Sequence, residues 1–299
     1  MLIACAPTGW SSEVPPEQIL TEITRAGYSA AVAMPRQGHT ALETVRLYAQ
    51  HWLFPAPGLY SDDFWRAERR TAILQETRLR ARFVLDVGCN DLFLSTGGYQ
   101  HYIGLHGKSR SELVGRITHD DGLNSAEWRR FVDLLHQAGE IAGRDGVRCC
   151  FRNQVGSVIE TAEEIDKLLT RTDPSLLYLG PDTGHLAWAG IDPVDFCRLH
   201  AERIQAIYLT DISPDVLRHG QSRGWDYDRF MRAGLFVTLG TGCVDFSGVL
   251  AALESAGFAG WAIVQPEPTP TLSAPQSAAA AREYLDNIIS ALRLKPPVL

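Results

Sequence analysis

Short apolar runs alternate with longer amphipathic stretches along the whole chain of 299 residues, and this alternation limits the fold more than any other feature. The predicted strands cover residues 2–6, 29–34, 52–59, 82–88, 147–151, 175–180, 204–212 and 260–265. The predicted helices cover residues 15–27, 40–50, 62–80, 125–145, 161–172, 192–203, 244–257 and 274–294. Strands that alternate with helices predict βαβ units and a parallel sheet. About eight such units in a chain of this length predict an α/β protein with the (β/α)8 TIM-barrel fold.

No break in composition divides the chain, so we expect a single domain over residues 1–299. A doubly wound open sheet is the competing fold, but it needs fewer strands. It also typically has a G-x-G-x-x-G pattern after its first strand, and this chain does not. The segment near residues 89–122 is unusually long for a connector. We therefore expect a loop insertion there that serves the function or contains a small element of its own.

Charge and composition argue against several classes of protein. The formal net charge is −7, and the chain lacks the basic clusters that are typical of nucleic-acid-binding domains. No apolar run reaches the roughly 20 residues of a membrane-spanning helix, and the start of the chain lacks the features of a signal peptide. The six cysteines form no C-x-x-C pair and are typical of buried thiols in a reducing compartment. We expect a cytoplasmic protein that binds neither nucleic acid nor membrane.

Polar and ionisable residues follow several of the predicted strands. In a TIM barrel the C-terminal ends of the strands form one mouth, where active sites lie. The residues at these ends are Trp10, Asp86, Asn90, Arg152, Gln154, Asp182, His185, Trp188, Tyr208, Asp211, Gln265 and Glu267. Taken singly, Asp182 could cap a helix, His185 could be a packed histidine, and Arg152 could pair with a structural carboxylate. Together they predict a site at the mouth, because burying so many unpaired polar groups would be costly.

Four segments match a known pattern in order and spacing. They are IACAPTGW, GSVIETAEEIDKLL, LLYLGPDTGHLAWAGIDPVDFCRLHAERIQAIYLTDI and LGTGCVDFSGVLAALESAGFAGW. These segments resemble the sequences of inosose dehydratase-like proteins, which belong to the xylose isomerase-like TIM barrels together with sugar-phosphate isomerases/epimerases and AP endonucleases. The resemblance covers most of the chain and is weakest over residues 35–125.

The resemblance implies a divalent metal at the mouth, with Glu or His, Asp, His and Glu as ligands from the fifth to the eighth strand. Such a metal acts as a Lewis acid, while flanking carboxylates or histidines transfer protons. Asp182 occupies the Asp position, and it is the metal ligand if a metal is bound. The other positions differ from the family pattern and hold Arg152-Asn153-Gln154, Tyr208 and Gln265, with Glu267 two residues after the last.

This substituted set is poorly suited to a metal, so the cofactor stays unknown at the sequence level. Asp, Gln and Tyr together are a poor ligand set for Zn²⁺ or Mn²⁺, and the fixed charge of Arg152 repels a cation. We hypothesise that Arg152 replaces the metal electrostatically. It would pair with Asp182 or Glu267, or bind an anionic or carbonyl oxygen of a ligand.

The first functional hypothesis is an isomerase, epimerase or dehydratase-like enzyme that transfers protons next to a carbonyl of a small polyhydroxylated molecule. Its predicted catalytic residues are Asp182, His185, Tyr208, Asp211 and Glu267. Its predicted substrate-binding residues are Trp10, Arg152, Gln154, Trp188 and Gln265.

The alternative is a diverged, non-catalytic barrel that acts as a ligand-binding protein or as the partner subunit of an enzyme. The substituted positions remain polar, which favours a working pocket. A nucleic-acid repair enzyme is a third alternative, and the acidic balance argues against it. The small residues of 273–281 predict either a helix-packing face or the contact surface of a homo-oligomer.

Overall fold

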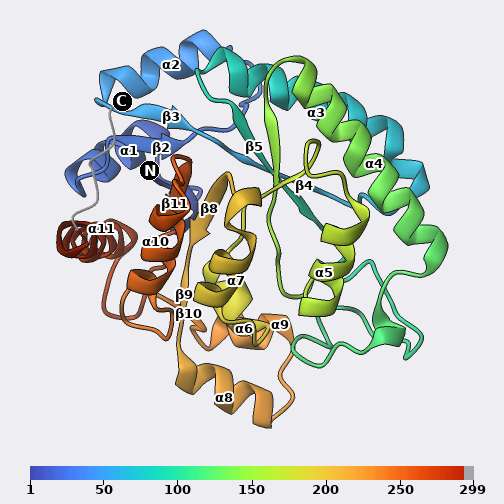
Figure 1. The fold of residues 1–299 in the computed structure, drawn as a ribbon. Helices are drawn as coiled ribbons and strands as arrows, with labels where there is room; N and C mark the ends of the chain where they lie inside the picture. The colour runs from blue at the N-terminus through green and yellow to red at the C-terminus, as the bar shows by residue number, and fades with distance from the viewer. Residues whose placement is uncertain (293–299) are drawn as a thin grey trace.

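A ring of parallel strands surrounded by helices forms the framework of the molecule in the computed structural model, which describes residues 1–292 (Figure 1). The strands are β1 (Leu2–Cys5), β2 (Ala30–Val32), β3 (Phe54–Ala56), β4 (Leu59–Asp62), β5 (Asp91–Thr96), β6 (Arg148–Phe151), β7 (Tyr178–Leu179), β8 (Ala206–Leu209), β9 (Asp211–Ile212), β10 (Phe236–Val237) and β11 (Trp261–Val264). The helices are α1 (Pro16–Arg25), α2 (Ala41–Gln50), α3 (Arg70–Asp86), α4 (Ser125–Arg144), α5 (Ala162–Arg171), α6 (Thr183–Trp188), α7 (Pro193–His200), α8 (Pro214–Ser222), α9 (Tyr227–Arg232), α10 (Phe246–Ser255) and α11 (Ala274–Ala291).

Nine of the strands form two parallel sheets, in the orders β3-β2-β1-β11-β8 and β4-β5-β6-β7, and β9 and β10 form a separate antiparallel pair. β3 and β4 are consecutive pieces of one barrel strand, which is interrupted at Pro57 and Gly58; β3 pairs with β2 and β4 pairs with β5. The other seam is closed by isolated parallel bridges from Leu179 to Ile204 and from Asp182 to Tyr208. The strands therefore occupy eight positions around a barrel, and the predicted (β/α)8 fold is confirmed.

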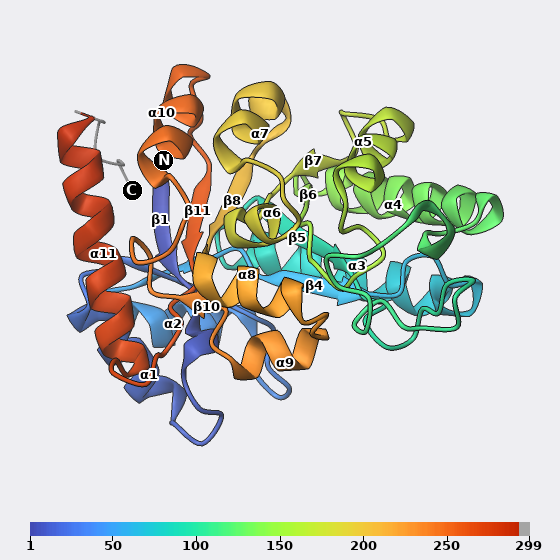
Figure 2. The same ribbon diagram turned by 90° about the horizontal axis from the view of Figure 1, so that it is seen from below.

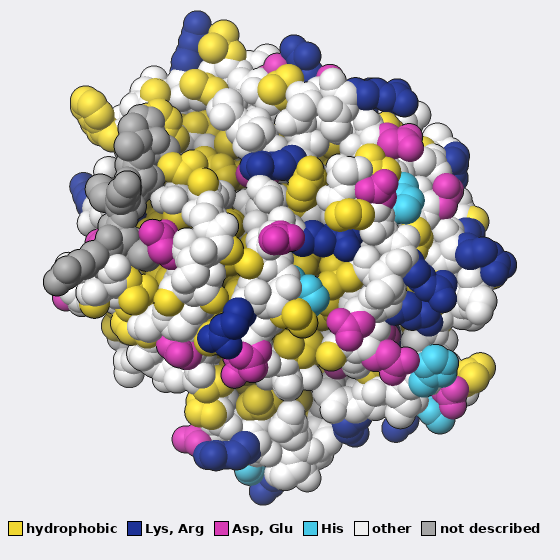
Figure 3. All heavy atoms as spheres, viewed as in Figure 1, with side chains coloured by type: hydrophobic (Ala, Val, Ile, Leu, Met, Phe, Trp, Pro, Cys, Tyr) yellow, Lys and Arg dark blue, Asp and Glu magenta, His cyan; other side chains and the backbone are white. Residues whose placement is uncertain are grey.

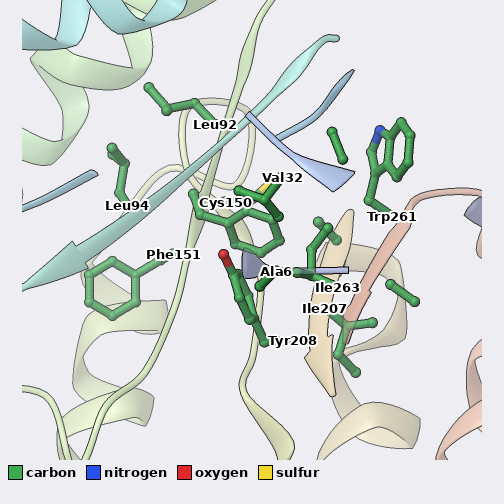
Figure 4. Packing of buried hydrophobic residues seen from close by; sticks show 14 of the residues in the cluster. Ala6, Val32, Leu92, Leu94, Cys150, Phe151, Ile207, Tyr208, Trp261 and Ile263 are labelled. Carbon is green, nitrogen blue, oxygen red and sulfur yellow. The ribbon is translucent and has the colours of Figure 1, made fainter. Parts of the chain in front are cut away.

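The barrel interior is filled by side chains, so it is a core and not a pore. Phe93 on β5 contacts the ring of Tyr208 on β8 edge-on, with 4.7 Å between the ring centroids, although these strands are not neighbours. The contact therefore crosses the barrel. Figure 4 shows Tyr208 among buried side chains that include Ala6, Cys150 and Ile207.

Local sequence signals account for many of the helix starts. Reciprocal capping boxes open α2 at Thr40, α4 at Asn124 and α5 at Thr161. The predicted box from Thr161 to Glu164 is confirmed. The small residues of α11 face inward: Ser277 bonds to Thr238, and the backbone carbonyl of Ala278 accepts from the Tyr28 hydroxyl. Of the two alternatives for residues 273–281, this packing favours the helix-packing face.

The fourth barrel strand was predicted in the wrong place. Residues 82–86 end helix α3, and the strand is β5, which lies inside the segment expected to be a loop near 89–122. Phe83, Val84 and Val87 are buried at helical spacing, and Arg82 pairs with Asp86 one turn away, as in a helix. Asp86 and Asn90 therefore lie before the strand, at the opposite end of the barrel from the mouth.

The helix expected to begin near residue 62 begins at Arg70 instead. Asp62 ends β4, and its carboxylate accepts two hydrogen bonds from the side chain of Arg69, the residue before α3. The long connector runs from the end of β5 to α4, over residues 97–124.

This connector and the segment of α8 and α9 lie on the same side of the barrel (Figures 1 and 2). The backbone N–H of Tyr227 donates to the carbonyl of Ser111 at 2.8 Å. Val114 of the connector packs with Trp188 and Phe230 in a second apolar cluster. These segments follow β5 and β8, so they surround the mouth at the C-terminal ends of the strands.

Candidate active site

A buried ion pair between Arg152 and Asp182 forms the centre of the mouth. Arg152 directly follows β6, and Asp182 follows β7 and pairs with Tyr208 in the bridge that closes the barrel. The Nε and Nη2 atoms of Arg152 both donate to Oδ2 of Asp182, with 3.0 Å between Nε and Oδ2. The side chains are 5% and 0% exposed, so the pair is shielded from water. Attraction to the guanidinium helps to hold the pKa of Asp182 below its usual range, against the opposing effect of burial.

The second oxygen of Asp182 is also occupied. Its Oδ1 accepts a bond from the hydroxyl of Thr210 and another from the backbone N–H of His185, which makes Asp182 the N-cap of α6. The amide oxygen of Asn153 accepts from the backbone N–H of Asp182 at 2.9 Å. The capping role considered for Asp182 is thus confirmed, and its carboxylate is anchored to three neighbouring strand ends.

His185 is a neutral, buried imidazole in this arrangement. Its Nδ1 accepts a bond from the backbone N–H of Val155 at 3.2 Å, so the ring proton is assigned to Nε2. Burial lowers the pKa of His185 to about 4, despite attraction to Asp182. At neutral pH His185 can donate a hydrogen bond through Nε2, but Nδ1 is not available as a base.

Glu267 is the partly exposed carboxyl group next to the ion pair. Gln265, which follows β11, donates from Nε2 to Oε1 of Glu267 at 2.7 Å. Burial raises the pKa of Glu267 above its usual range, and repulsion from Asp182 adds to this effect, whereas Arg152 opposes it. Glu267 therefore combines partial access to solvent with a pKa closer to neutrality, as a general base requires.

One tyrosine ring packs against the guanidinium, and two further tyrosines lie within range of its charge. Arg152 lies over the ring of Tyr208, with 4.5 Å from Cζ to the centroid, and burial raises the pKa of that tyrosine to about 12. Tyr99, on the connector, meets the ring of Tyr227, on α9, edge-on at 5.5 Å. The charge of Arg152 acts on all three hydroxyls.

Tyr99 and Tyr227 were not predicted as site residues from the sequence. Tyr99 lies in the segment whose strand was misplaced, and Tyr227 lies in the helix α9, which was not predicted. Gln154, a predicted binding residue, accepts a bond from Ser95 on β5 at 3.3 Å. Gln154 follows β6, so this bond joins the ends of β5 and β6 at the mouth.

Asp211 was predicted as a catalytic residue, but the structure places it in a different role. Its two oxygens accept four backbone N–H bonds at 2.9–3.0 Å, from Ile212, Gly240, Gly242 and Val244. The carboxylate is fully buried. Asp211 therefore holds the loop between β10 and α10 and has no free oxygen for a substrate.

The two tryptophans expected to line the site also lie elsewhere. Trp188 is 1% exposed and packs behind His185, with parallel rings whose centroids are 6.0 Å apart. Trp10 donates from Nε1 to Glu22 at 2.6 Å and lines a cavity of about 460 Å³ between α1 and α2. Trp188 supports the imidazole from behind, and the Trp10 cavity lies outside the cluster around Arg152.

The described residues do not fit the divalent metal that the family resemblance implies. Residues 1–292 contain no group of three or more His, Cys, Asp or Glu side chains arranged to hold an ion. A carboxylate offers about four lone-pair positions, and Asp182 already accepts four hydrogen bonds. The positive guanidinium of Arg152 lies directly beside it, so this donor set does not suit a cation.

Comparison with known proteins gives the relationships of the chain. The model of the family described as xylose isomerase-like TIM barrel matches residues 54–288. An inosose dehydratase from Geobacillus kaustophilus is 31% identical over 301 residues, which cover 96% of this chain and 94% of the relative. An inosose dehydratase from Clostridium beijerinckii is 34% identical over 163 residues, about half of each protein (54% and 55%).

Solved structures share the fold at lower sequence identity. An L-ribulose 3-epimerase has a TM-score of 0.69 at 15% identity and covers 98% of this chain and 96% of its own. The IOLI protein, whose structure has a binding zinc atom, has a TM-score of 0.67 at 17% identity and covers 98% of this chain and 99% of its own. With the family model matching most of the barrel, the chain belongs to the xylose isomerase-like TIM-barrel family.

Proposed function

We propose that the protein is an enzyme that transfers a proton at a carbon next to a carbonyl of a small polyhydroxylated molecule. Dehydration of a keto-cyclitol is the first candidate reaction, and isomerisation or epimerisation of a ketose is the second. The observation behind the proposal is the partly exposed Glu267 carboxyl beside the buried pair of Arg152 and Asp182. The relative that matches the chain over nearly its whole length is named for inosose dehydration, which supports the lyase chemistry.

In this proposal Glu267 is the general base. Its carboxylate removes a proton from the carbon next to the carbonyl, and the electron pair of the broken C–H bond forms an enolate. The bond from Gln265 orients the carboxylate. In a dehydration the enolate then expels the hydroxyl group on the next carbon, which takes the proton from the protonated Glu267 and leaves as water. In an isomerisation or epimerisation the proton returns to another carbon or to the other face.

The other mouth residues are neutral donors at neutral pH. Tyr208 keeps its proton because its pKa is about 12, and His185 carries its ring proton on Nε2. Either group can donate to a substrate oxygen while carrying no charge. Asp182 is committed to Arg152, Thr210 and the α6 backbone, so its role is to position the guanidinium.

The surface is consistent with a small-molecule enzyme. On the face shown in Figure 3, Lys and Arg side chains alternate with Asp and Glu, without a continuous basic stretch of the kind that binds nucleic acid. Over residues 1–292 no helix is both long and apolar enough to cross a bilayer. Five of the six free cysteines are buried, which supports the proposed cytoplasmic location. Assembly into a homo-oligomer stays a prediction.

The test is proton exchange with solvent. The enzyme is incubated in D₂O with keto-cyclitols and ketoses, and deuterium at the carbon next to the carbonyl is followed by NMR. We expect exchange with at least one keto-cyclitol, and its loss in Glu267→Gln. Glu254→Gln, an exposed change on α10, is the matched control and should leave exchange unchanged. A wild-type protein that exchanges no substrate of either class would contradict the proposal and favour a non-catalytic binding protein.

A further inference from the structure

The guanidinium of Arg152 has one nitrogen that the protein leaves unused. Nε and Nη2 both donate to Asp182. No atom of residues 1–292 accepts a hydrogen bond from Nη1, although the side chain is only 5% exposed. A buried guanidinium normally satisfies its five N–H donors. The two N–H bonds of Nη1 are therefore available to an oxygen atom that comes from outside the chain.

The surroundings hold this guanidinium in a fixed position. Asp182 bonds it on one edge, and the ring of Tyr208 covers its face at 4.5 Å. Asp182 is itself held by Thr210 and by the N-terminus of α6. A donor that is already oriented in a water-poor site is suited to stabilise negative charge that develops during a reaction.

We propose that the Arg152 guanidinium takes the place of the divalent cation at this barrel mouth, and that the site acts without a metal. Nη1 binds the carbonyl oxygen of the substrate and stabilises the enolate oxygen that forms when the neighbouring carbon loses its proton. The role of Nη1 in stabilising the enolate rests on the proposed function. The replacement of the cation by Arg152 does not depend on it.

The hydrogen bonds of the residues at the metal-ligand positions support the replacement of the cation by Arg152. All four lone-pair positions of Asp182 are filled by hydrogen bonds from Arg152, Thr210 and His185, so a cation would have to displace protein donors. Tyr208 has a pKa of about 12 and does not ionise readily to become a ligand. Gln265 replaces a charged ligand with a neutral amide, and its Nε2 donates to Glu267, a second carboxyl group at the mouth.

The metal content of the full-length wild-type protein is the first test. The purified protein is analysed by mass spectrometry for metals and titrated calorimetrically with Mn²⁺ and Zn²⁺. We expect no stoichiometric metal and no saturable binding, and treatment with a chelator should leave the melting temperature unchanged. One tightly held divalent ion per chain, lost from Asp182→Asn, would overturn the proposal.

The second test restores a ligand set. The double variant Arg152→Glu/Gln265→Glu replaces the guanidinium and one amide with carboxylates beside Asp182 and Glu267. We expect it to bind Mn²⁺, seen by electron paramagnetic resonance and as a Mn²⁺-dependent rise in melting temperature. Arg148→Glu is the matched control on the same strand, beside Asp91, and should not bind Mn²⁺. A double variant that folds but takes up no Mn²⁺ would show that Arg152 does not occupy the position of the cation.

The third test separates the role of Nη1 from the proposed function. Arg152→Lys keeps a positive charge near Asp182 but lacks the two N–H donors of Nη1. We expect kcat for exchange to fall by roughly 10²–10³-fold, the typical loss of one oxyanion donor, with a smaller change in KM. An unchanged kcat would overturn the role of Nη1. If the wild type catalyses no proton exchange on any substrate, the proposed function fails. The metal measurements still test whether Arg152 replaces the cation.

Discussion

The two ends of β6 each present an arginine that pairs with an aspartate of a neighbouring strand, yet the two pairs differ. At the N-terminal end Arg148 forms a bidentate pair with Asp91, at 2.7 and 3.0 Å, and its Nη1 donates to Gln205. The Arg148 side chain is 32% exposed. At the mouth, Arg152 is 5% exposed, and its Nη1 is left without a partner in the described chain.

The pair of Arg148 and Asp91 is therefore structural, whereas the pair of Arg152 and Asp182 keeps donors that a ligand can use. All three guanidinium nitrogens of Arg148 have partners, and water can reach the side chain. The Arg152 side chain is almost fully buried, yet its Nη1 has no hydrogen-bond partner among the described residues and is open at the mouth, so a ligand oxygen can complete its hydrogen bonds. The comparison predicts that changes at the mouth pair are more damaging than the same changes at the other pair.

The largest effect is expected when the aspartates are changed. Asp182→Asn leaves a buried guanidinium without its counter-charge, so we expect the free energy of unfolding to fall by about 3–5 kcal/mol. Asp91→Asn should cost about 1–3 kcal/mol, because Arg148 keeps its bond to Gln205 and can turn toward water. Urea unfolding followed by circular dichroism measures both. Equal losses would break the comparison.

The next effect concerns catalysis and should appear only at the mouth. We expect Glu267→Gln to lower kcat by roughly 10²–10⁴-fold, while the free energy of unfolding changes by less than about 1 kcal/mol. Because the pKa of Glu267 is raised, the wild-type rate should fall on acidification at a higher pH than for an ordinary glutamate. Steady-state kinetics across pH test this. Gln205→Ala, which alters the opposite end of the barrel, should keep the wild-type profile.

The sequence predicted which residues lie at the mouth better than it predicted their contacts. Alternation of strands and helices, together with the capping signals, was sufficient for the barrel and for the convergence of Arg152, Asp182, Tyr208 and Gln265. The strand at 91–96 was missed because Phe83, Val84 and Val87 form an equally apolar run, and the pairing of Arg82 with Asp86 that makes it helical is a weak local signal.

Bond partners could not be predicted from residue type alone. Asp211 and Asp182 both follow barrel strands, but Asp211 accepts three backbone N–H bonds from a loop far along the chain, which no spacing rule indicates. Tyr99 and Tyr227 meet each other only because the connector after β5 and the segment of α8 and α9 lie together at the mouth. These contacts depend on tertiary structure, which overrides local pattern.

A smaller effect is expected from pH, because two buried groups at the mouth end have opposite shifts. Burial raises the pKa of Glu160 from 4.5 to about 7, and its carboxyl accepts bonds from Gly115 and Gly156 at 2.7 Å. The folded state thus holds this proton more tightly, so stability falls as pH rises from 4.5 to 7. Burial lowers the pKa of His185 from 6.5 to about 4, so its contribution to stability falls as pH drops through that range.

The two contributions, each up to about 3 kcal/mol, oppose each other between pH 4.5 and 6.5. Wild-type stability should therefore change little across this interval. In Glu160→Gln the His185 contribution is unmasked, and the free energy of unfolding should fall on acidification below pH 6.5. Urea unfolding at a series of pH values gives the slopes, which do not depend on the absolute cost of the substitution. A variant with the same flat profile as the wild type would refute the assignment.

The smallest effect is expected at Trp188, which lies behind His185. The Trp188 side chain is buried and its indole N–H has no hydrogen-bond partner among the described residues. Trp188→Phe removes this unsatisfied donor, which offsets part of the lost apolar contact with Tyr227 and Phe230. We expect the free energy of unfolding to change by less than about 1 kcal/mol, against about 3–5 kcal/mol for Trp188→Ala. Because Trp188 supports the imidazole without touching Arg152, the phenylalanine variant should keep most of the exchange rate, and a large loss would place Trp188 among the residues that position the site.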